Sequence, residues 1–82
     1  MDPDFVFQRM MEFIVINDFD QAKISAISDM NKISDNCLSS MLIMNANTDI
    51  ELIKIMAGFS VMSEKVKQYY INPEKAISDY RK

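Results

Sequence analysis

Apolar residues recur three or four positions apart in almost every stretch of the 82-residue chain, which is the spacing that places side chains on one face of an α-helix. The one short segment that could instead be a strand, residues 37–44, has no second candidate strand with which to pair. The sequence therefore predicts an all-α fold, a small compact bundle of four to five helices in a single domain over residues 1–82. A chain of this length buries only about 60% of its unfolded surface, so its core is small.

Three helices are expected before residue 48. Asp2 followed by Pro3 is a start signal for the first, because proline at the first helical position has no amide proton to leave unbonded. A second helix follows Asn17-Asp18, and its apolar positions keep helical spacing: Phe19, Ala22, Ala26, Met30 and Ile33. The third segment, residues 37–44, is apolar on nearly all sides.

The clearest element begins at Thr48-Asp49-Ile50-Glu51, a capping box in which the Thr and Glu side chains bond free amides of the first turn. An unbroken alternation of three and four residues follows it: Leu52, Ile55, Phe59, Met62, Val66 and Tyr69. This seam predicts one long helix near residues 49–70. Pro73 then marks a stop and a short last helix, because the residue before a proline resists helical geometry.

The composition excludes most catalytic and cofactor-binding chemistry. The chain has no histidine, one cysteine and one glycine. It therefore lacks the residues for histidine-based catalysis, a zinc site of cysteines and histidines, an internal disulfide or a glycine-rich phosphate loop. We expect no enzyme activity, no catalytic residue, no metal and no cofactor. The single thiol, Cys37, is expected to be buried and inert, as free cysteines usually are.

Neither membrane insertion nor nucleic-acid binding is favoured. The longest apolar runs are four residues, whereas a membrane span needs about 20, so we expect a cytoplasmic protein without a span. The net charge is −3, and neither half of the chain has the basic patch that binds nucleic-acid phosphates. Ile, Lys and Asn far outnumber Ala, Gly, Pro and Arg, a bias expected of a low-GC source such as a phage.

The apolar side chains exceed what so small a core can hold, since several helices carry them on two sides. We therefore predict a non-enzymatic protein–protein interaction module, a regulator, inhibitor or adaptor, that presents an apolar helical surface to a protein partner and forms a homodimer. The candidate interface residues lie outside the main apolar stripes: Phe5, Val15, Ile16, Met41, Ile43, Met44, Ile50, Ile53 and Val61.

A second hypothesis comes from residues 27–61. Residues 27–40 contain an apolar helix end, a turn at Asn31-Lys32, an Ile-Ser entry and an apolar contact in the next helix, and a further helix follows over residues 47–61. This stretch resembles the Cro/C1-type, lambda repressor-like helix-turn-helix family. The resemblance implies a DNA-binding transcriptional regulator and a helix break near residues 60–63. It also implies that the contacts to bases or phosphates are made by Ser34, Asn36, Ser39 and Ser40.

Two features set the sequence apart from that family. The turn commonly holds a glycine, and the second helix presents polar or basic side chains to the bases. Here the turn is Asn31-Lys32, and no Arg, Lys or Gln lies between Asp35 and Asn47. DNA binding would need the fold to bring Arg9, Lys23 and Lys32 together, so it remains the alternative to the interaction module.

Overall fold

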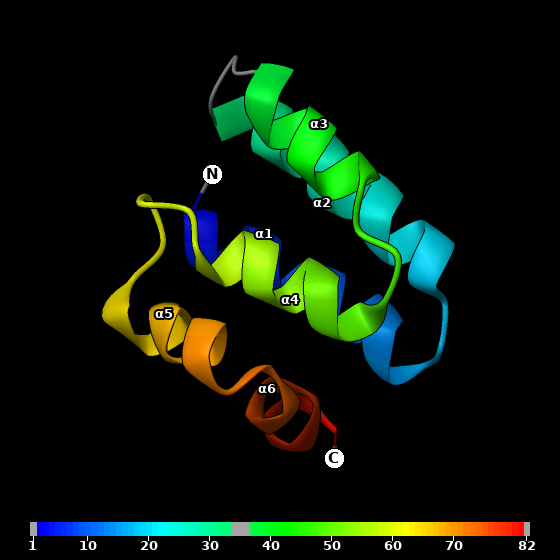
Figure 1. Cartoon of the computed structure of the whole chain (residues 1–82), viewed down its shortest axis with the longest axis vertical. Helices are drawn as coiled ribbons and strands as arrows, with labels where there is room; N and C mark the ends of the chain where they lie inside the picture. The colour runs from blue at the N-terminus through cyan, green and yellow to red at the C-terminus, as the bar shows by residue number, and fades with distance from the viewer. Residues whose placement is uncertain (1, 34–36, 82) are drawn as a thin grey trace.

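A computed structural model describes residues 2–33 and 37–81, and these residues form six α-helices and no strand (Figure 1). The helices are α1 (Pro3–Val15), α2 (Phe19–Ile33), α3 (Cys37–Met44), α4 (Asp49–Ala57), α5 (Glu64–Ile71) and α6 (Pro73–Tyr80). The prediction of an all-α fold is confirmed. The predicted number of helices is too low by at least one.

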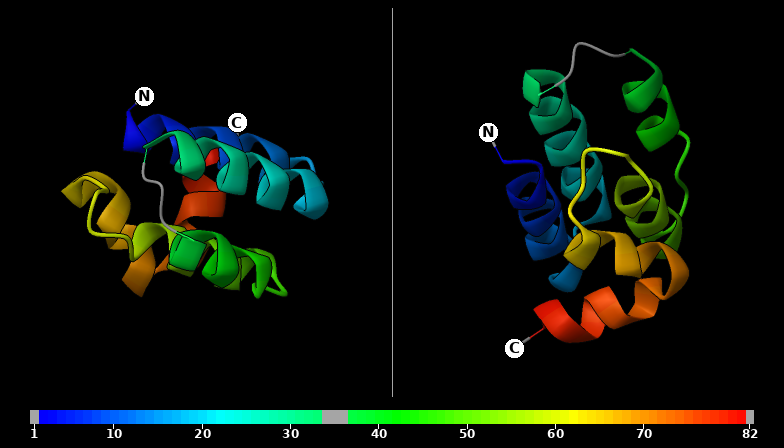
Figure 2. Two further views of the ribbon diagram at one scale, coloured as in Figure 1. Left: turned by 90° about the horizontal axis from the view of Figure 1, so that it is seen from above. Right: turned by 90° about the vertical axis from the view of Figure 1, so that its left-hand side faces the viewer.

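The helices lie in two layers (Figure 2). α1 and α2 pair in one layer, and α3, α4 and α5 lie in the other. α6 runs between the layers at one end and packs on α1, α4 and α5. α3 turns back along α2 and packs against it, so the two helices run side by side in opposite directions (Figures 1 and 2).

A tight turn at Asn17 joins α1 to α2. Asn17 has φ 63°, the left-handed conformation that asparagine tolerates better than most residues. The amides of Asn17 and Asp18 donate to the carbonyls of Ile14 and Phe13, at 3.0 and 2.9 Å, which together form a Schellman motif. The Asp18 carboxylate then accepts from the Gln21 amide at 3.2 Å and caps α2. This turn sets the two helices side by side.

The core fills the space between the layers. An aromatic cluster joins α1, α5 and α6: the rings of Phe7 and Tyr69 stack with centroids 5.6 Å apart, and Tyr80 meets both edge-on. The buried apolar residues come from every helix and from two connecting loops: Val6, Phe7, Met10, Met11, Ile14, Ala22, Ala26, Met30, Ile43, Ala46, Leu52, Ile53, Met56, Ala57, Met62, Val66, Tyr69 and Ala76.

The prediction of one long helix near residues 49–70 is wrong. α4 ends at Ala57, where the amide of Gly58 closes the last turn by donating to the Lys54 carbonyl at 2.9 Å. α5 begins after Ser63, whose hydroxyl accepts from the Val66 amide, and the Ser63 amide donates to the Asp4 carboxylate at 3.1 Å. The loop is thus tied to the start of α1, and the helix break implied by the family resemblance is present.

Candidate interaction surface

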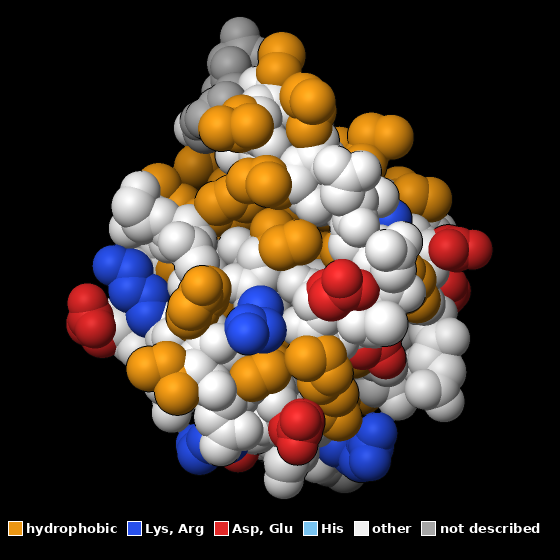
Figure 3. All heavy atoms as spheres, viewed as in Figure 1, with side chains coloured by type: hydrophobic (Ala, Val, Ile, Leu, Met, Phe, Trp, Pro, Cys, Tyr) orange, Lys and Arg blue, Asp and Glu red, His pale blue; other side chains and the backbone are white. Residues whose placement is uncertain are grey.

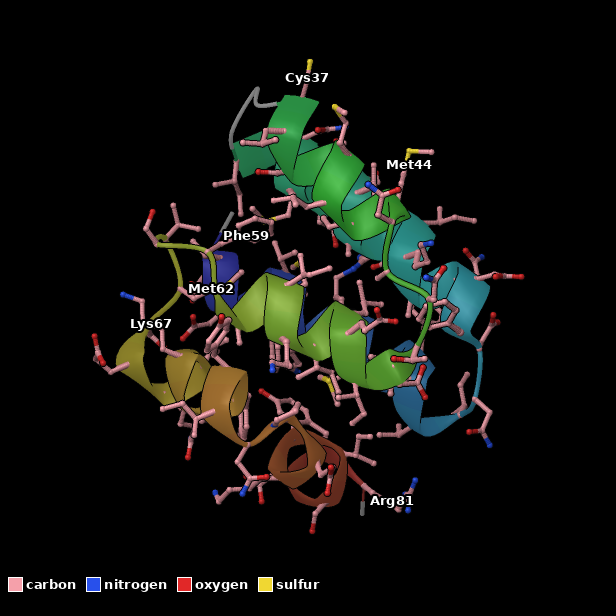
Figure 4. The ribbon with its side chains drawn as sticks, in the orientation of Figure 1. Cys37, Met44, Phe59, Met62, Lys67 and Arg81 are labelled. Atoms are coloured by element: carbon pink, nitrogen blue, oxygen red, sulfur yellow. The ribbon has the colours of Figure 1, made fainter. Side chains whose placement is uncertain are left out.

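α3 buries the polar Ser39 together with Ile43 and leaves most of its apolar side chains exposed. Ser39 and Ile43 are buried against the rest of the protein, whereas the other apolar side chains are 41–63% exposed: Leu38, Met41, Leu42 and Met44. In Figure 4 the Met44 side chain points away from the molecule. We call Met41, Leu42 and Met44 the α3 face. A surface helix normally turns most of its apolar side chains toward the core.

α2 holds α3 in this orientation through polar contacts. The Lys23 ammonium donates to the carbonyls of Met44 and Ala46, at 2.6 and 2.9 Å, and so caps the end of α3. The Ser40 hydroxyl donates to the Asn31 side-chain oxygen at 3.0 Å. These contacts hold one side and one end of α3 against α2, so Met41, Leu42 and Met44 on the other sides of the helix are left exposed to solvent.

An open groove of about 540 Å³ continues the α3 face across α4 and α5. We call it the α4–α5 groove, and it is lined by Leu42, Glu51, Lys54, Ile55, Gly58, Phe59 and Tyr70. Leu42 belongs to both surfaces. Figure 3 shows the apolar side chains gathered over α3 and reaching down to α4, with charged side chains between them at the centre of this face.

The charges in the groove differ in how they are satisfied. The Glu51 carboxylate accepts from the Asn47 amide at 3.1 Å and from the Thr48 hydroxyl at 3.2 Å, while the Thr48 hydroxyl oxygen accepts from the Glu51 amide at 3.1 Å. The reciprocal bonding of the predicted capping box is therefore present, with the amide of Asn47 in place of that of Thr48. Lys54 instead lies over the Tyr70 ring, 5.5 Å from its centroid.

Gly58 lets the Tyr70 ring lie close to the end of α4. A Cβ atom at this position would lie 3.2 Å from the Tyr70 ring and 3.2 Å from the Lys54 carbonyl oxygen. Both distances are shorter than ordinary van der Waals contact. The single glycine of the chain thus shapes the floor of the groove.

The structure separates the predicted interface residues. Met41 and Met44 lie together on the α3 face. Phe5 and Val61 are exposed elsewhere, and Ile16 is 67% exposed at the opposite end of α1 from Phe5. Val15 and Ile50 are half-buried.

Two of the predicted interface residues need correction. Ile43 and Ile53 are fully buried, so neither side chain can contact a partner on the folded protein. Ile43 faces inward from α3, and Ile53 lies on the side of α4 that packs on the core. Cys37, expected to be buried, is exposed at the first turn of α3 and points away from the molecule (Figure 4).

Sequence reasoning missed the residues of the groove. Ile55 and Phe59 belong to the seam that predicts one long helix, and the structure leaves both half-buried. Leu42 belongs to the third segment, which is apolar on nearly all sides. The available signal was the spacing of Glu51, Lys54, Ile55, Gly58 and Phe59, which places all five along one side of two turns.

The residues implied by the helix-turn-helix resemblance are differently placed. Ser34 and Asn36 lie outside the described residues, Ser39 is buried, and Ser40 is bonded to Asn31. α3 runs back along α2, whereas the two helices of that motif cross at roughly 90–120°. The surface that α3 offers to solvent is apolar and has no base-contacting side chain.

The three cations that DNA binding would need are engaged within the fold. The Arg9 Nε atom lies 2.9 Å from the Asp29 carboxylate, which is almost fully buried, and the Lys32 ammonium lies 3.7 Å from the same group. Lys23 caps α3. None of them forms a basic patch with the others on the α3 face.

In the described part of the chain, no group of three or more His, Cys, Asp or Glu side chains is placed to hold a metal ion. The longest helix, α2, has 15 residues, and no helix over residues 2–33 and 37–81 is long and apolar enough to cross a membrane.

No family model, curated protein or solved structure matches the chain. The α3 face and the α4–α5 groove must therefore be interpreted from their own shape and charges.

Proposed function

We propose that the protein is a non-enzymatic interaction module, a small regulator, inhibitor or adaptor, that binds protein partners through the α3 face and the α4–α5 groove. The observation that carries the proposal is the exposure of three large apolar side chains on α3, those of Met41, Leu42 and Met44, while Ser39 and Ile43 of the same helix are buried. A contiguous apolar patch on a small protein is typical of an interaction site. Methionine side chains are flexible and polarizable, so they adapt to a partner's surface.

The proposal includes a homodimer in which the α3 faces of two copies pack together. Such an interface is self-complementary, so the patch on one copy meets the same patch on the other. α3 carries no charged side chain. Like charges of the two copies therefore do not face each other at the centre of the dimer interface. Covering the exposed half of each side chain of the α3 face contributes roughly 1 kcal/mol.

A matched pair of variants tests this proposal. Met44, the last residue of α3, is 63% exposed, and Ile16, the C-cap residue directly after α1, is 67% exposed. We expect light scattering over a dilution series to show a dimer for the wild type and for Ile16→Asp, and a monomer for Met44→Asp. A wild type that is monomeric at every concentration would overturn the homodimer.

The DNA-binding alternative predicts a different result. Contacts to phosphates make affinity for duplex DNA fall steeply with salt, whereas an apolar protein interface does not respond in this way. We expect no salt-dependent binding of duplex DNA in a fluorescence anisotropy titration. Binding that weakens steeply with salt and is lost in Arg9→Met would favour the helix-turn-helix alternative.

A further inference from the structure

We propose that the α4–α5 groove binds an amphipathic helix of another protein, one that carries acidic residues beside its apolar stripe. This inference rests on the proposed function and names the class of partner that the groove accepts.

The shape of the groove suits a helix. Its lining residues on α4 and directly after that helix run from Glu51 to Phe59, about two turns, and Leu42 and Tyr70 form its apolar sides. A second hollow of about 350 Å³ continues past Tyr70 and includes Lys67 and Ile71. An elongated apolar trough of this kind receives the apolar stripe of a helix, with residues of the partner spaced three and four apart.

The groove is less acidic than the rest of the protein. The chain has a net charge of −3. Around the two hollows Lys54 and Lys67 balance Glu51 and Glu64, the last of which lies 3.8 Å from the Lys67 ammonium, so this region sums to +2 − 2 = 0 and the remainder carries −3. An acidic partner that approaches this acidic protein is therefore repelled least at the groove.

The individual contacts strengthen this difference. The Glu51 carboxylate is occupied by bonds from Asn47 and Thr48 at the positive end of α4. Within residues 2–33 and 37–81, no carboxylate lies within ion-pair distance of Lys54, whose ammonium group faces the Tyr70 ring. Among the described residues, the only carboxylate within ion-pair distance of the Lys67 ammonium is that of Glu64, which lies 3.8 Å away on a 94% exposed side chain, and such a surface pair contributes little. Both lysines are thus available to carboxylates of a partner.

The α3 face of a second copy does not supply those carboxylates, because α3 has neither acidic nor basic residues. That face could enter the groove of another copy only without pairing with Lys54 or Lys67. A helix with acidic residues beside its apolar stripe satisfies both the apolar walls and the lysines.

Two synthetic helical peptides test the inference. Both carry leucines at positions i, i+3, i+4 and i+7; one has glutamates and the other has lysines at the flanking positions. We expect the acidic peptide to bind the full chain on the order of tenfold more tightly in a fluorescence anisotropy titration, as two surface ion pairs allow. Lys54→Glu should abolish that preference.

Matched variants locate the effect. Lys65→Glu makes the same charge change on α5 beside Gln8 and Tyr69, outside the groove, and should keep the preference. Leu42→Asp should weaken both peptides, because it places a charge in the apolar wall. Lys54→Gln removes the charge without reversing it and should give an intermediate preference for the acidic peptide. This variant keeps the test valid if Lys54→Glu does not fold.

Each other outcome overturns the inference in a distinct way. Equal binding of the two peptides, lost in Leu42→Asp, refutes the acidic partner and leaves the interaction module standing. Failure of both peptides to bind refutes a helical occupant. If both peptides fail and Tyr70→Asp, which changes the groove but not the α3 face, converts a wild-type dimer to a monomer, the groove belongs to a second copy. If both peptides fail and the wild type is a monomer at every concentration, the proposed function itself fails.

Discussion

Tyr69 shows how one side chain joins three helices. Its buried ring stacks on Phe7, and its hydroxyl donates to the Asp79 carboxylate at 2.7 Å, which also accepts from the Lys75 ammonium at 3.0 Å. The hydrogen bond from Tyr69 and then that from Lys75 lower the pKa of Asp79. Burial, followed by the same hydrogen bond to Asp79, raises the pKa of Tyr69. The cluster therefore favours a charged Asp79 and a neutral Tyr69.

The lowered pKa of Asp79 predicts an acid-sensitive contribution to stability. The folded-state pKa lies below the unfolded value of 3.8, so charged Asp79 stabilises the protein fully above that value, and the effect is lost as pH falls through the folded pKa. In urea unfolding, Asp79→Asn should be less stable than the wild type near pH 6, with the difference shrinking below about pH 4. Glu74→Gln, an exposed carboxylate on the same helix, is the control. A difference that stays constant with pH would contradict the prediction.

At the level of the helices, apolar spacing predicts which residues face the core better than it predicts where a helix is continuous. The seam from Leu52 to Tyr69 was read as one helix, yet the chain leaves helical geometry between Gly58 and Ser63. Met62 is buried and Phe59 half-buried within that loop, so the loop preserves the pattern without the helix. The local signals for the break were Gly58, a poor helix former, and Ser63, a good N-cap.

The orientation of α3 could not be predicted from its sequence. The segment is apolar on nearly all sides, so periodicity does not choose which side faces the core. Contacts with α2 make the choice, since Lys23 and Asn31 bond to one side and one end of α3. The apolar character of the whole segment predicts an exposed side chain equally for Met41, Ile43 and Met44. The prediction is wrong for Ile43, which the contacts with α2 turn toward the core.

Lys23 is therefore expected to fix α3 in place. Lys23→Met keeps most of the apolar stem but removes both hydrogen bonds to the end of α3, and it should cost about 1 kcal/mol of unfolding free energy. Lys65→Met is the matched control, because the Lys65 ammonium has no hydrogen bond or ion pair within the part of the chain that the structure describes. Hydrogen exchange should also be faster in α3 of Lys23→Met. Equal stability and equal exchange in the two variants would exclude this role.

Considered as a whole, the molecule is two thin layers of helices around a small core, and it has little stability to spare. A domain of this size is expected to be stable by about 4–12 kcal/mol. The division between core and surface is sharp within single helices: on α3, Ile43 is fully buried between the exposed Leu42 and Met44. Single substitutions should therefore differ greatly in cost according to which side they touch.

Ile53 and Met41 provide the test of that division, since both were predicted from sequence to contact a partner. Ile53 is fully buried, and Ile53→Ala should cost about 3 kcal/mol, which lowers the melting temperature by roughly 12–24 °C. Met41 is 59% exposed, and in dilute protein Met41→Ala should change the unfolding free energy by less than about 0.5 kcal/mol. If α3 faces pair in a dimer, the cost of Met41→Ala must grow with protein concentration, because only the dimer buries that side chain. Calorimetry at two protein concentrations separates the two cases. A destabilisation by Ile53→Ala that does not change with concentration would assign Ile53 to the core. A destabilisation by Met41→Ala that grows with concentration would assign Met41 to an interface. Similar, concentration-independent costs for both would contradict this assignment of the α3 face.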